Sequence, residues 1–540
     1  MALTETRTEV PADVTAGRPS GLGVLGVGDH KVIGRLFIIT SLVFLVAAVA
    51  ATELLAVDRL EDHGDHHLFL TNAKAFTQLF TTHEYVGVFL GLLPLFLGIA
   101  LVVVPLQIGA RTIAFPRAAT AAYGMYMLGG ALMIASIAAN GGLAGDRNKG
   151  IELWFLALGL VLIALLLAAG CVITTVFALR APGMTLDRVP LFTWGFLAAS
   201  VIWLLTLPVL LASLLVYYVD FRHGGVMVGD VATGSLYFKT LWAVRQPELY
   251  AIAAPALGFF GDVLPVTARA RYDSKLLEYQ GALINIGAFA VLGFGAFLVT
   301  SVGRTTHSLV FIVMAFLAPL PVLALLALSG DLFRRGAKVG KPQVGAAFMF
   351  ATAGVVLLVV ATIAGAVRSV PPAKVQGTLF DSGHFLLILL AGVAAAIGAL
   401  HFWSTKIIGK PVNDLAGAGA GFLVLAGGFV YGVAEMVNGG FGNQVQSGAT
   451  GMVGWNYVAA AGGAVALLGV VLGVVNLLPA LRPGGGEAPS DPWDGHTLEW
   501  LTTSPPEPGN FAEVPYVTSE APLLDRREAT GSTSEQEEAR

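Results

Sequence analysis

The chain has 540 residues, of which 56% are hydrophobic and 12% are charged, and its mean hydropathy is +0.76. Soluble domains carry about 25% charged residues, so this composition excludes an ordinary water-soluble globular protein. The formal net charge is −4 and basic residues are sparse, which excludes a nucleic-acid-binding footprint. The single cysteine, Cys171, lies in an apolar run, so neither an intrachain disulfide nor a Cys-x-x-Cys-His haem attachment is possible.

The composition divides the chain into three parts. Residues 1–30 are polar and lack the basic start and short apolar core of a cleaved signal peptide, so they are predicted to be a cytoplasmic N-terminal tail. Residues 31–481 are predicted to be one transmembrane domain. Residues 482–540 are rich in Pro, Gly, Glu and Ser and are predicted to be a cytoplasmic C-terminal tail, disordered over 532–540.

Twelve apolar stretches are long enough to cross a bilayer, which takes about 20 residues in a helix. Because a spanning segment must satisfy its own backbone hydrogen bonds, we expect helices. The fold class is therefore an all-α polytopic membrane protein of about twelve helices. The stretches are 33–57, 80–109, 119–142, 152–179, 190–218, 238–265, 278–302, 307–329, 344–367, 378–404, 416–437 and 453–479.

Basic residues in the short loops predict the orientation, because cytoplasmic loops carry an excess of Lys and Arg. With a cytoplasmic N-terminus, the outer loops carry seven and the inner loops carry thirteen. The outer set is Arg59, Arg147, Lys149, Arg222, Arg304, Arg368 and Lys374, and the inner set is Arg111, Arg117, Arg180, Arg188, Arg269, Arg271, Lys275, Arg334, Arg335, Lys338, Lys341, Lys406 and Lys410. We therefore predict a multi-pass protein of a bacterial-type inner membrane with both termini in the cytoplasm.

Titratable residues inside spans are candidates for function, because an ionisable group at membrane depth is costly unless it is paired or ligated. His83 and His384 each lie a few residues into a span that runs from outside to inside, so they are expected at similar depth. Two neutral imidazoles at equal depth suit the two axial positions of a low-spin haem. Two hydrogen-bonded histidines packed between helices are the alternative. We interpret His401, beside Trp403, as part of an interfacial aromatic belt, and His307 as a surface residue.

Three other polar features are ambiguous from the sequence. Arg245 and Glu248 share a helix face and could form an ion pair at a kink or belong to a proton or quinone site. Glu435 is an intramembrane acid without an obvious partner. The loop 58–67 contains three histidines among carboxylates, which could bind a divalent metal but are more often solvated.

Several motifs resemble subunit I of the haem-copper oxidases, the cytochrome c and quinol oxidases. The segment Thr81–Arg117 is similar to the family's second helix and the loop after it, and residues 246–250, Gln-Pro-Glu-Leu-Tyr, resemble the sixth-helix motif His-Pro-Glu-Val-Tyr. The tail 491–511, with Asp-Pro-Trp-Asp-Gly-His-Thr-Leu-Glu-Trp at its start, is the most specific match. The resemblance covers residues 30–511 and implies the family's twelve-helix fold and haem cofactors.

The resemblance also implies lost ligands. The family's three copper histidines fall at Gln246, Val299 and Thr300, none of which suits copper, whereas Glu248 and Tyr250 match the family's proton-path glutamate and its cross-linked tyrosine. Two further proton-path residues are missing. We therefore expect no copper.

His83 falls on the family's low-spin haem ligand, whereas His384 is ambiguous. The family's tenth helix carries two histidines two residues apart, one for each haem. An ungapped comparison puts His384 on the first, for the oxygen-binding haem, and Leu386 on the second. A shift of two residues puts His384 on the second. Pairing with His83 favours the low-spin position, so we expect one low-spin a- or b-type haem.

Three functions follow from these expectations. The first is a cytochrome c oxidase subunit I-like protein that binds one low-spin haem and transfers electrons in a respiratory complex, with other subunits, without reducing oxygen. The second is an active terminal oxidase. The third is a haem-free structural or assembly subunit.

Overall fold

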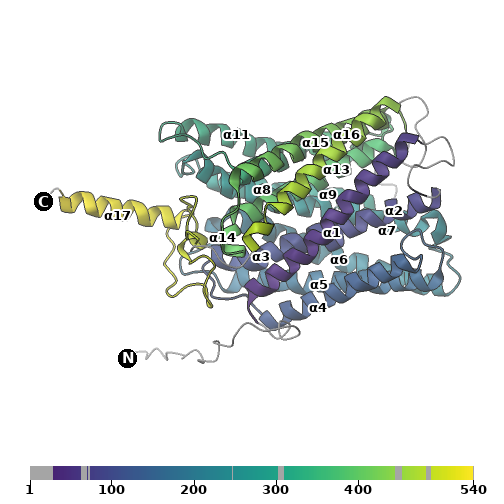
Figure 1. Cartoon of the computed structure of the whole chain (residues 1–540), viewed down its shortest axis with the longest axis horizontal. Helices are drawn as coiled ribbons and strands as arrows, with labels where there is room; N and C mark the ends of the chain where they lie inside the picture. The colour runs from purple at the N-terminus through teal and green to yellow at the C-terminus, as the bar shows by residue number, and fades with distance from the viewer. Residues whose placement is uncertain are drawn as a thin grey trace.

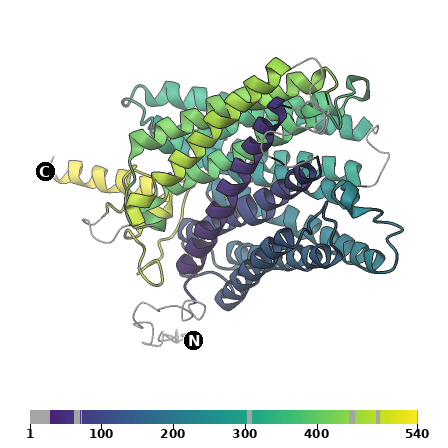
Figure 2. The same cartoon turned by 45° about the vertical axis from the view of Figure 1, so that its right-hand side comes forward.

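The computed structural model describes residues 28–61, 70, 73–245, 247–301, 309–443, 453–481 and 488–538, and the regular elements among them are all helices. Figure 1 shows long helices lying side by side, with the C-terminal tail and α17 at one end of the bundle. Figure 2 shows the same arrangement from a second direction, with the N-terminal helix α1 lying against the C-terminal part of the bundle.

The helices follow one another with short connections. The α-helices and the π-helix η3 are α1 (His30–Asp58), α2 (Ala73–Tyr85), η3 (Val86–Leu92), α3 (Leu93–Gln107), α4 (Pro116–Ala138), α5 (Asn148–Ala178), α6 (Leu191–Arg222), α7 (Ser235–Arg245), α8 (Pro247–Ala268), α9 (Glu278–Ser301), α10 (Leu309–Leu317), α11 (Pro319–Gly336), α12 (Ala346–Ser369), α13 (Leu379–Phe402), α14 (Ser404–Ile407), α15 (Asp414–Gly440), α16 (Val453–Val475) and α17 (Pro522–Glu538). Short 3₁₀ turns are η2 (Arg59–Glu61), η4 (Leu186–Arg188), η5 (Val231–Thr233), η7 (Pro371–Ala373), η8 (Leu478–Leu481) and η9 (Leu498–Leu501).

The predicted fold class is confirmed. Eleven helical stretches in the described part of the chain are long and apolar enough to cross a membrane. A further helix, α9, has 24 residues, which corresponds to about 36 Å. One predicted span is divided: α10 ends at Leu317 before α11 begins at Pro319. Proline lacks the backbone N–H that a helix interior needs, so it stands naturally in a first turn.

Burial separates central from peripheral helices. The apolar windows of α8 and α13 are 100% buried and that of α2–α3 is 94% buried, whereas the window of α4 is 39% buried. The three central helices therefore contact protein on all sides, and the lipid-facing residues belong to the helices around them.

The C-terminal tail lies across one end of the bundle, which we call the tail end. All five loops that the charge pattern assigns to the cytoplasm meet at this end, so they lie on the same side of the bundle. The contacts that show this are Ala181 N–H to Ile108 O, Val517 N–H to Pro182 O, Arg271 to Asp525, Gln343 N–H to Thr267 O, and Lys406 Nζ to Thr502 O. Helix α17 extends to Glu538, into the stretch 532–540 for which the composition predicts disorder.

Glycines allow helices to approach closely in the bundle interior. A Cβ atom on Gly195 in α6 would overlap the carbonyl oxygen of Ala254 in α8, and one on Gly258 in α8 would overlap the carbonyl oxygen of Leu191 in α6. Small residues at such crossings are typical of membrane helices, where van der Waals packing drives association. The close α6–α8 crossing therefore requires glycine, which has no side chain, at positions 195 and 258.

We expect Gly195→Ala to destabilise the protein by about 1–3 kcal/mol, because the overlapping atom is backbone and can yield only if the helices separate. Gly170→Ala is the matched control, since a Cβ there meets nothing within 4 Å, and it should change stability by at most about 1 kcal/mol. Thermal unfolding of the two purified variants measures the difference. Equal midpoints would contradict the close packing of α6 against α8.

Candidate functional site

His83 and His384 lie at comparable depth on helices that run in the same direction. Helices α3 and α13 both end beside Glu499, whose carboxylate accepts hydrogen bonds from Gln107 Nε2 at 3.2 Å and Trp403 Nε1 at 3.1 Å. Near mid-helix, a Cβ on Gly392 would lie 2.8 Å from Leu92 Cδ2. His83 is nine residues and His384 eight residues before that crossing, which corresponds to about 13 Å and about 12 Å of helix.

The His83 side chain is buried, and a backbone carbonyl orients its ring. It is 8% exposed, and its Nδ1 lies 3.2 Å from the carbonyl oxygen of Leu79. A carbonyl can only accept, so Nδ1 carries the proton and the lone pair of the neutral ring is on Nε2. This backbone contact is the kind that orients iron-ligating histidines. The π-helix η3 begins three residues later, and such segments frequently mark functional sites.

His384 is buried near the start of α13, with an exposed fraction of 4%. The small cavity next to this turn is lined by Leu386, Leu389 and Leu390 together with Glu53 and Tyr431. Successive residues of an α-helix are about 100° apart, so His384 lies about 200° round the helix from Leu386. That cavity therefore belongs to the Leu386 face of α13, and a group ligated by His384 would lie on a different face.

Two neutral imidazoles are a suitable donor set for haem iron. The burial of both histidines, the oriented Nε2 of His83 and the matched depth all fit such a group. His384 and Leu386 lie on different faces of α13. Both assignments of His384, to the first or to the second of the family's tenth-helix histidines, stay predictions.

Two buried ion pairs flank the turn that carries His384, and the sequence did not reveal either. Arg59, at the end of α1, contacts Glu435 of α15 at 2.8 Å, with 10% and 2% of the two side chains exposed. Arg368 of α12 pairs with Asp381 in the first turn of α13. Glu435 thus has a partner, and both arginines, which the charge pattern assigns to outer loops, neutralise buried carboxylates.

The histidine at the other end of α13 differs from expectation. His401 is 1% exposed rather than interfacial; its Nδ1 donates to Ile397 O at 2.9 Å and its Nε2 accepts from Asn476 Nδ2 at 3.2 Å. Both ring nitrogens are therefore used in packing α13 against the end of α16. Trp403 is also fully buried, so neither residue belongs to an aromatic belt.

Several predicted site residues lie outside the described part of the chain. These are Gln246, the side chains of Arg245, Glu248, Tyr250, Val299 and Thr300, residue His307, and residues 62–69 of the candidate metal loop. Their roles stay predictions.

A polar cluster at the tail end was not foreseen. Gln107 Nε2 donates to both Asp262, at 2.8 Å, and Glu499, at 3.2 Å, and Gln107 Oε1 accepts from Thr193 at 2.7 Å. Asp262 also accepts from the backbone N–H groups of Leu191 and Phe192 at the start of α6. Burial raises the pKa of the Glu499 carboxyl. The cluster joins α3, α6 and α8 to the tail.

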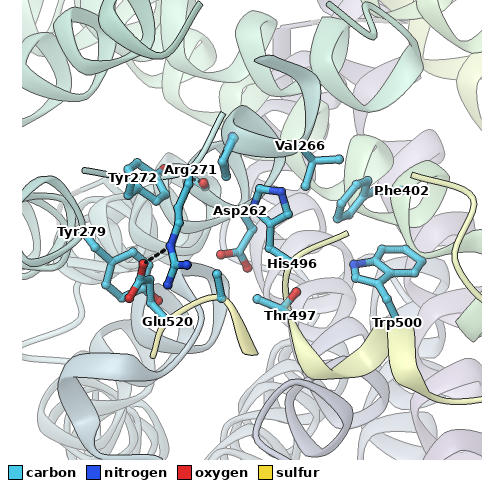
Figure 3. Close-up of a pocket in the computed structure, with 13 residues that line it drawn as sticks. Asp262, Val266, Arg271, Tyr272, Tyr279, Phe402, His496, Thr497, Trp500 and Glu520 are labelled. Carbon is cyan, nitrogen blue, oxygen red and sulfur yellow. Dashed lines mark hydrogen bonds and ion pairs between the residues drawn. The ribbon is translucent and has the colours of Figure 1, made fainter. Parts of the chain in front are cut away.

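Figure 3 shows the small pocket beside this cluster, where His496 and Trp500 of the tail lie near Asp262, and Arg271 pairs with Glu520. Burial, followed by the positive charges of Arg527 and Arg271, lowers the pKa of His496 to about 4. His496 is therefore held as the neutral ring in the docked tail.

We expect Arg59→Gln to destabilise the protein by about 3–5 kcal/mol, because it leaves the Glu435 carboxylate buried without its cation. Arg334→Gln is the control, since Arg334 pairs with Asp331 while 77% of its side chain is exposed, and exposed pairs contribute about 1 kcal/mol or less. Equilibrium unfolding of both variants tests this, and similar losses would show that the Arg59–Glu435 pair is not buried as described.

We expect His496 to contribute a loss of stability as pH falls from about 6.5 towards 4. The unfolded chain takes up a proton on His496 near pH 6.5, whereas the folded tail resists protonation until pH is about 4. The linked loss is at most about 3 kcal/mol, from 1.36 kcal/mol per pH unit. Thermal unfolding at several pH values should show that the wild type loses stability relative to His496→Gln as pH falls through this range. His223→Gln, at an exposed histidine, should behave like the wild type, and an unchanged pH profile in His496→Gln would contradict the assignment.

Comparisons with known proteins agree with this architecture. Residues 32–465 match the family model "Cytochrome C and Quinol oxidase polypeptide I". A putative cytochrome c oxidase subunit 1-beta of Streptomyces avermitilis is 30% identical over 97% of this chain and 95% of its own length. A probable cytochrome c oxidase subunit 1-beta of Nocardia farcinica is 29% identical over 92% of this chain and 87% of its own. A heme-copper terminal oxidase solved by cryo-EM superposes with a TM-score of 0.68 at 16% identity, covering 93% of this chain and 89% of that one, which shows a shared fold. The chain is a multi-pass membrane protein that belongs to the cytochrome c and quinol oxidase polypeptide I family.

Proposed function

We propose that this chain is a subunit I homologue that binds one low-spin haem and transfers electrons within a respiratory complex without reducing oxygen itself. The observation that carries the proposal is the combination of two buried imidazoles at matched depth, His83 and His384, with the absence of histidine at the three positions where the family holds copper. The proposed haem is of a- or b-type.

The copper positions are occupied by Gln246, Val299 and Thr300. An amide oxygen is a weak ligand for copper compared with imidazole, and a valine side chain offers no donor atom. The loss of all three nitrogen donors removes the site rather than adjusting its potential. Glu248 and Tyr250 match family positions, and without the partner histidine Tyr250 has nothing to cross-link.

A haem between these helices would supply a one-electron redox centre. The chain's own part is to hold the ligands. Leu79 O accepts from His83 Nδ1 and so orients the His83 ring, and the buried pairs Arg59–Glu435 and Arg368–Asp381 hold α1, α15 and α12 around the turn of His384. The positive charges of those two arginines balance the carboxylates that they contact, which limits the uncompensated charge next to a redox centre.

The surroundings of the chain complete the proposal. Both termini would be cytoplasmic, because the tail-end loops carry the excess of Lys and Arg. In that orientation His83 and His384 would lie towards the outer face, where an external electron donor could approach. Companion subunits of an oxidase-type complex are the proposed partners for onward transfer.

Reduced-minus-oxidised and carbon monoxide difference spectra of the purified protein, with iron and copper content per chain, test the function. We expect one low-spin haem, no carbon monoxide response and no copper. A carbon-monoxide-reactive haem together with copper would show an active oxidase instead. A protein without haem would show a structural or assembly subunit.

Single variants test the ligands. His83→Ala and His384→Ala should each abolish the low-spin band, whereas His401→Asn should keep it, because both nitrogens of His401 are used by Ile397 and Asn476. Leu386→His separates the two tenth-helix alignments. Survival of the band in His384→Ala would show that the pairing of His83 with His384 is wrong. A wild type without the band, together with a bis-histidine spectrum in Leu386→His, would show that position 386 is the low-spin position.

A further inference from the structure

A groove runs along the outside of the bundle between α1 and α16, at the tail end. It has a volume of about 760 Å³, and its walls come from Ile39, Val43 and Val46 of α1 and from Val474 and Leu478 on the side of α16. Leu400 and Ile407, both nearly fully buried, form its floor. The groove is thus a concave surface with a floor of protein, unlike the ridged surface of a helix that simply faces lipid.

The length of the groove corresponds to one leaflet. Along α1 it extends from Arg35 to Val46, a separation of eleven positions and about 16 Å of helix. Half of a hydrocarbon core of about 30 Å is about 15 Å. Its wall residues Ile39 and Val43 are 54% and 67% exposed, so the groove is open from the side where the bilayer lies.

Two cations stand at the tail end of the same groove. Arg35 and Lys410 both line it, although they are 375 positions apart in the chain. Arg35 Nε donates to Lys31 O at 3.1 Å, and within the described residues no carboxylate forms an ion pair with its guanidinium. A guanidinium can bind phosphate through two parallel hydrogen bonds. The charge of the groove is therefore placed where a lipid headgroup would be.

We infer that this groove binds one anionic phospholipid of the leaflet on the tail side. Arg35 and Lys410 hold its phosphate, and an acyl chain lies along α1 and α16 over Leu400 and Ile407. Basic pockets between transmembrane helices on the cytoplasmic side bind anionic lipid headgroups in this way. The inference goes beyond the proposed function and does not depend on haem binding.

Native mass spectrometry of the purified full chain, with any subunits that accompany it, in phosphatidylglycerol or phosphatidylcholine tests this. The wild type should retain one phosphatidylglycerol molecule in preference to phosphatidylcholine. Each basic residue near an anionic surface contributes about five-fold, so the double variant Arg35→Gln/Lys410→Gln should weaken that preference about 30-fold. The control Arg111→Gln/Arg117→Gln removes two exposed cations at the same end outside the groove and should keep it.

Val43→Trp provides a second measurement that leaves both cations in place. The indole should fill the groove and displace phosphatidylglycerol and phosphatidylcholine alike. An unchanged phosphatidylglycerol preference in Arg35→Gln/Lys410→Gln, an equal loss in the control, or lipid binding that Val43→Trp does not disturb would overturn the inference. A photo-crosslinker at Val43 that captures a companion protein instead of lipid would also overturn it.

Discussion

The structure depends on pairing polar groups between helices in a bundle that has almost no water to offer them. Arg59 reaches Glu435, Arg368 reaches Asp381, and Asp262 accepts from the start of α6 and from Gln107. Each partner comes from a different helix, so every pair is also a constraint on how two helices lie. An unpaired carboxylate buried between these helices would cost several kcal/mol, enough to favour its protonation or to destabilise the bundle. The polar groups therefore fix helix positions that apolar packing alone would leave adjustable.

The sequence predicts the helices well because the bilayer sets a simple length rule. Stretches of about 20 apolar residues must be helical, and the starts and ends of α12, α13 and α15 fall within a few residues of expectation. The sequence does not predict the break before Pro319, since proline inside a membrane helix is compatible with either a kink or a new start. Helix direction also follows from counting spans, which is why the matched depth of His83 and His384 could be anticipated.

Pairing between distant residues could not be anticipated in the same way. Arg59 and Glu435 are 376 positions apart, and a single sequence contains no signal that joins them. Arg59 follows a span and thus looked like a loop cation, and Glu435 looked unpaired. Rotation about a helix axis is similarly hidden. From the sequence alone, either His384 or Leu386 could face a given neighbouring helix, because both lie in one turn. In the structure Leu386 lines a cavity together with Glu53 and Tyr431. The sequence therefore predicts how deep a residue lies in the membrane, whereas the packing of the helices determines which way its side chain points.

Contacts at the tail end explain how His83 and His384 are kept at matched depth near the opposite end of the bundle. Glu499 accepts hydrogen bonds from Gln107 at the end of α3 and from Trp403 at the end of α13. Helices are stiff over this length, so fixing two parallel helices at one end also fixes the relative height of residues some 30 Å away. The C-terminal tail, far from either histidine, thereby contributes to the register of His83 and His384. A tail that merely covered the bundle would not need buried carboxylates, whereas a tail that aligns α3 with α13 requires hydrogen bonds of fixed length and direction at that junction.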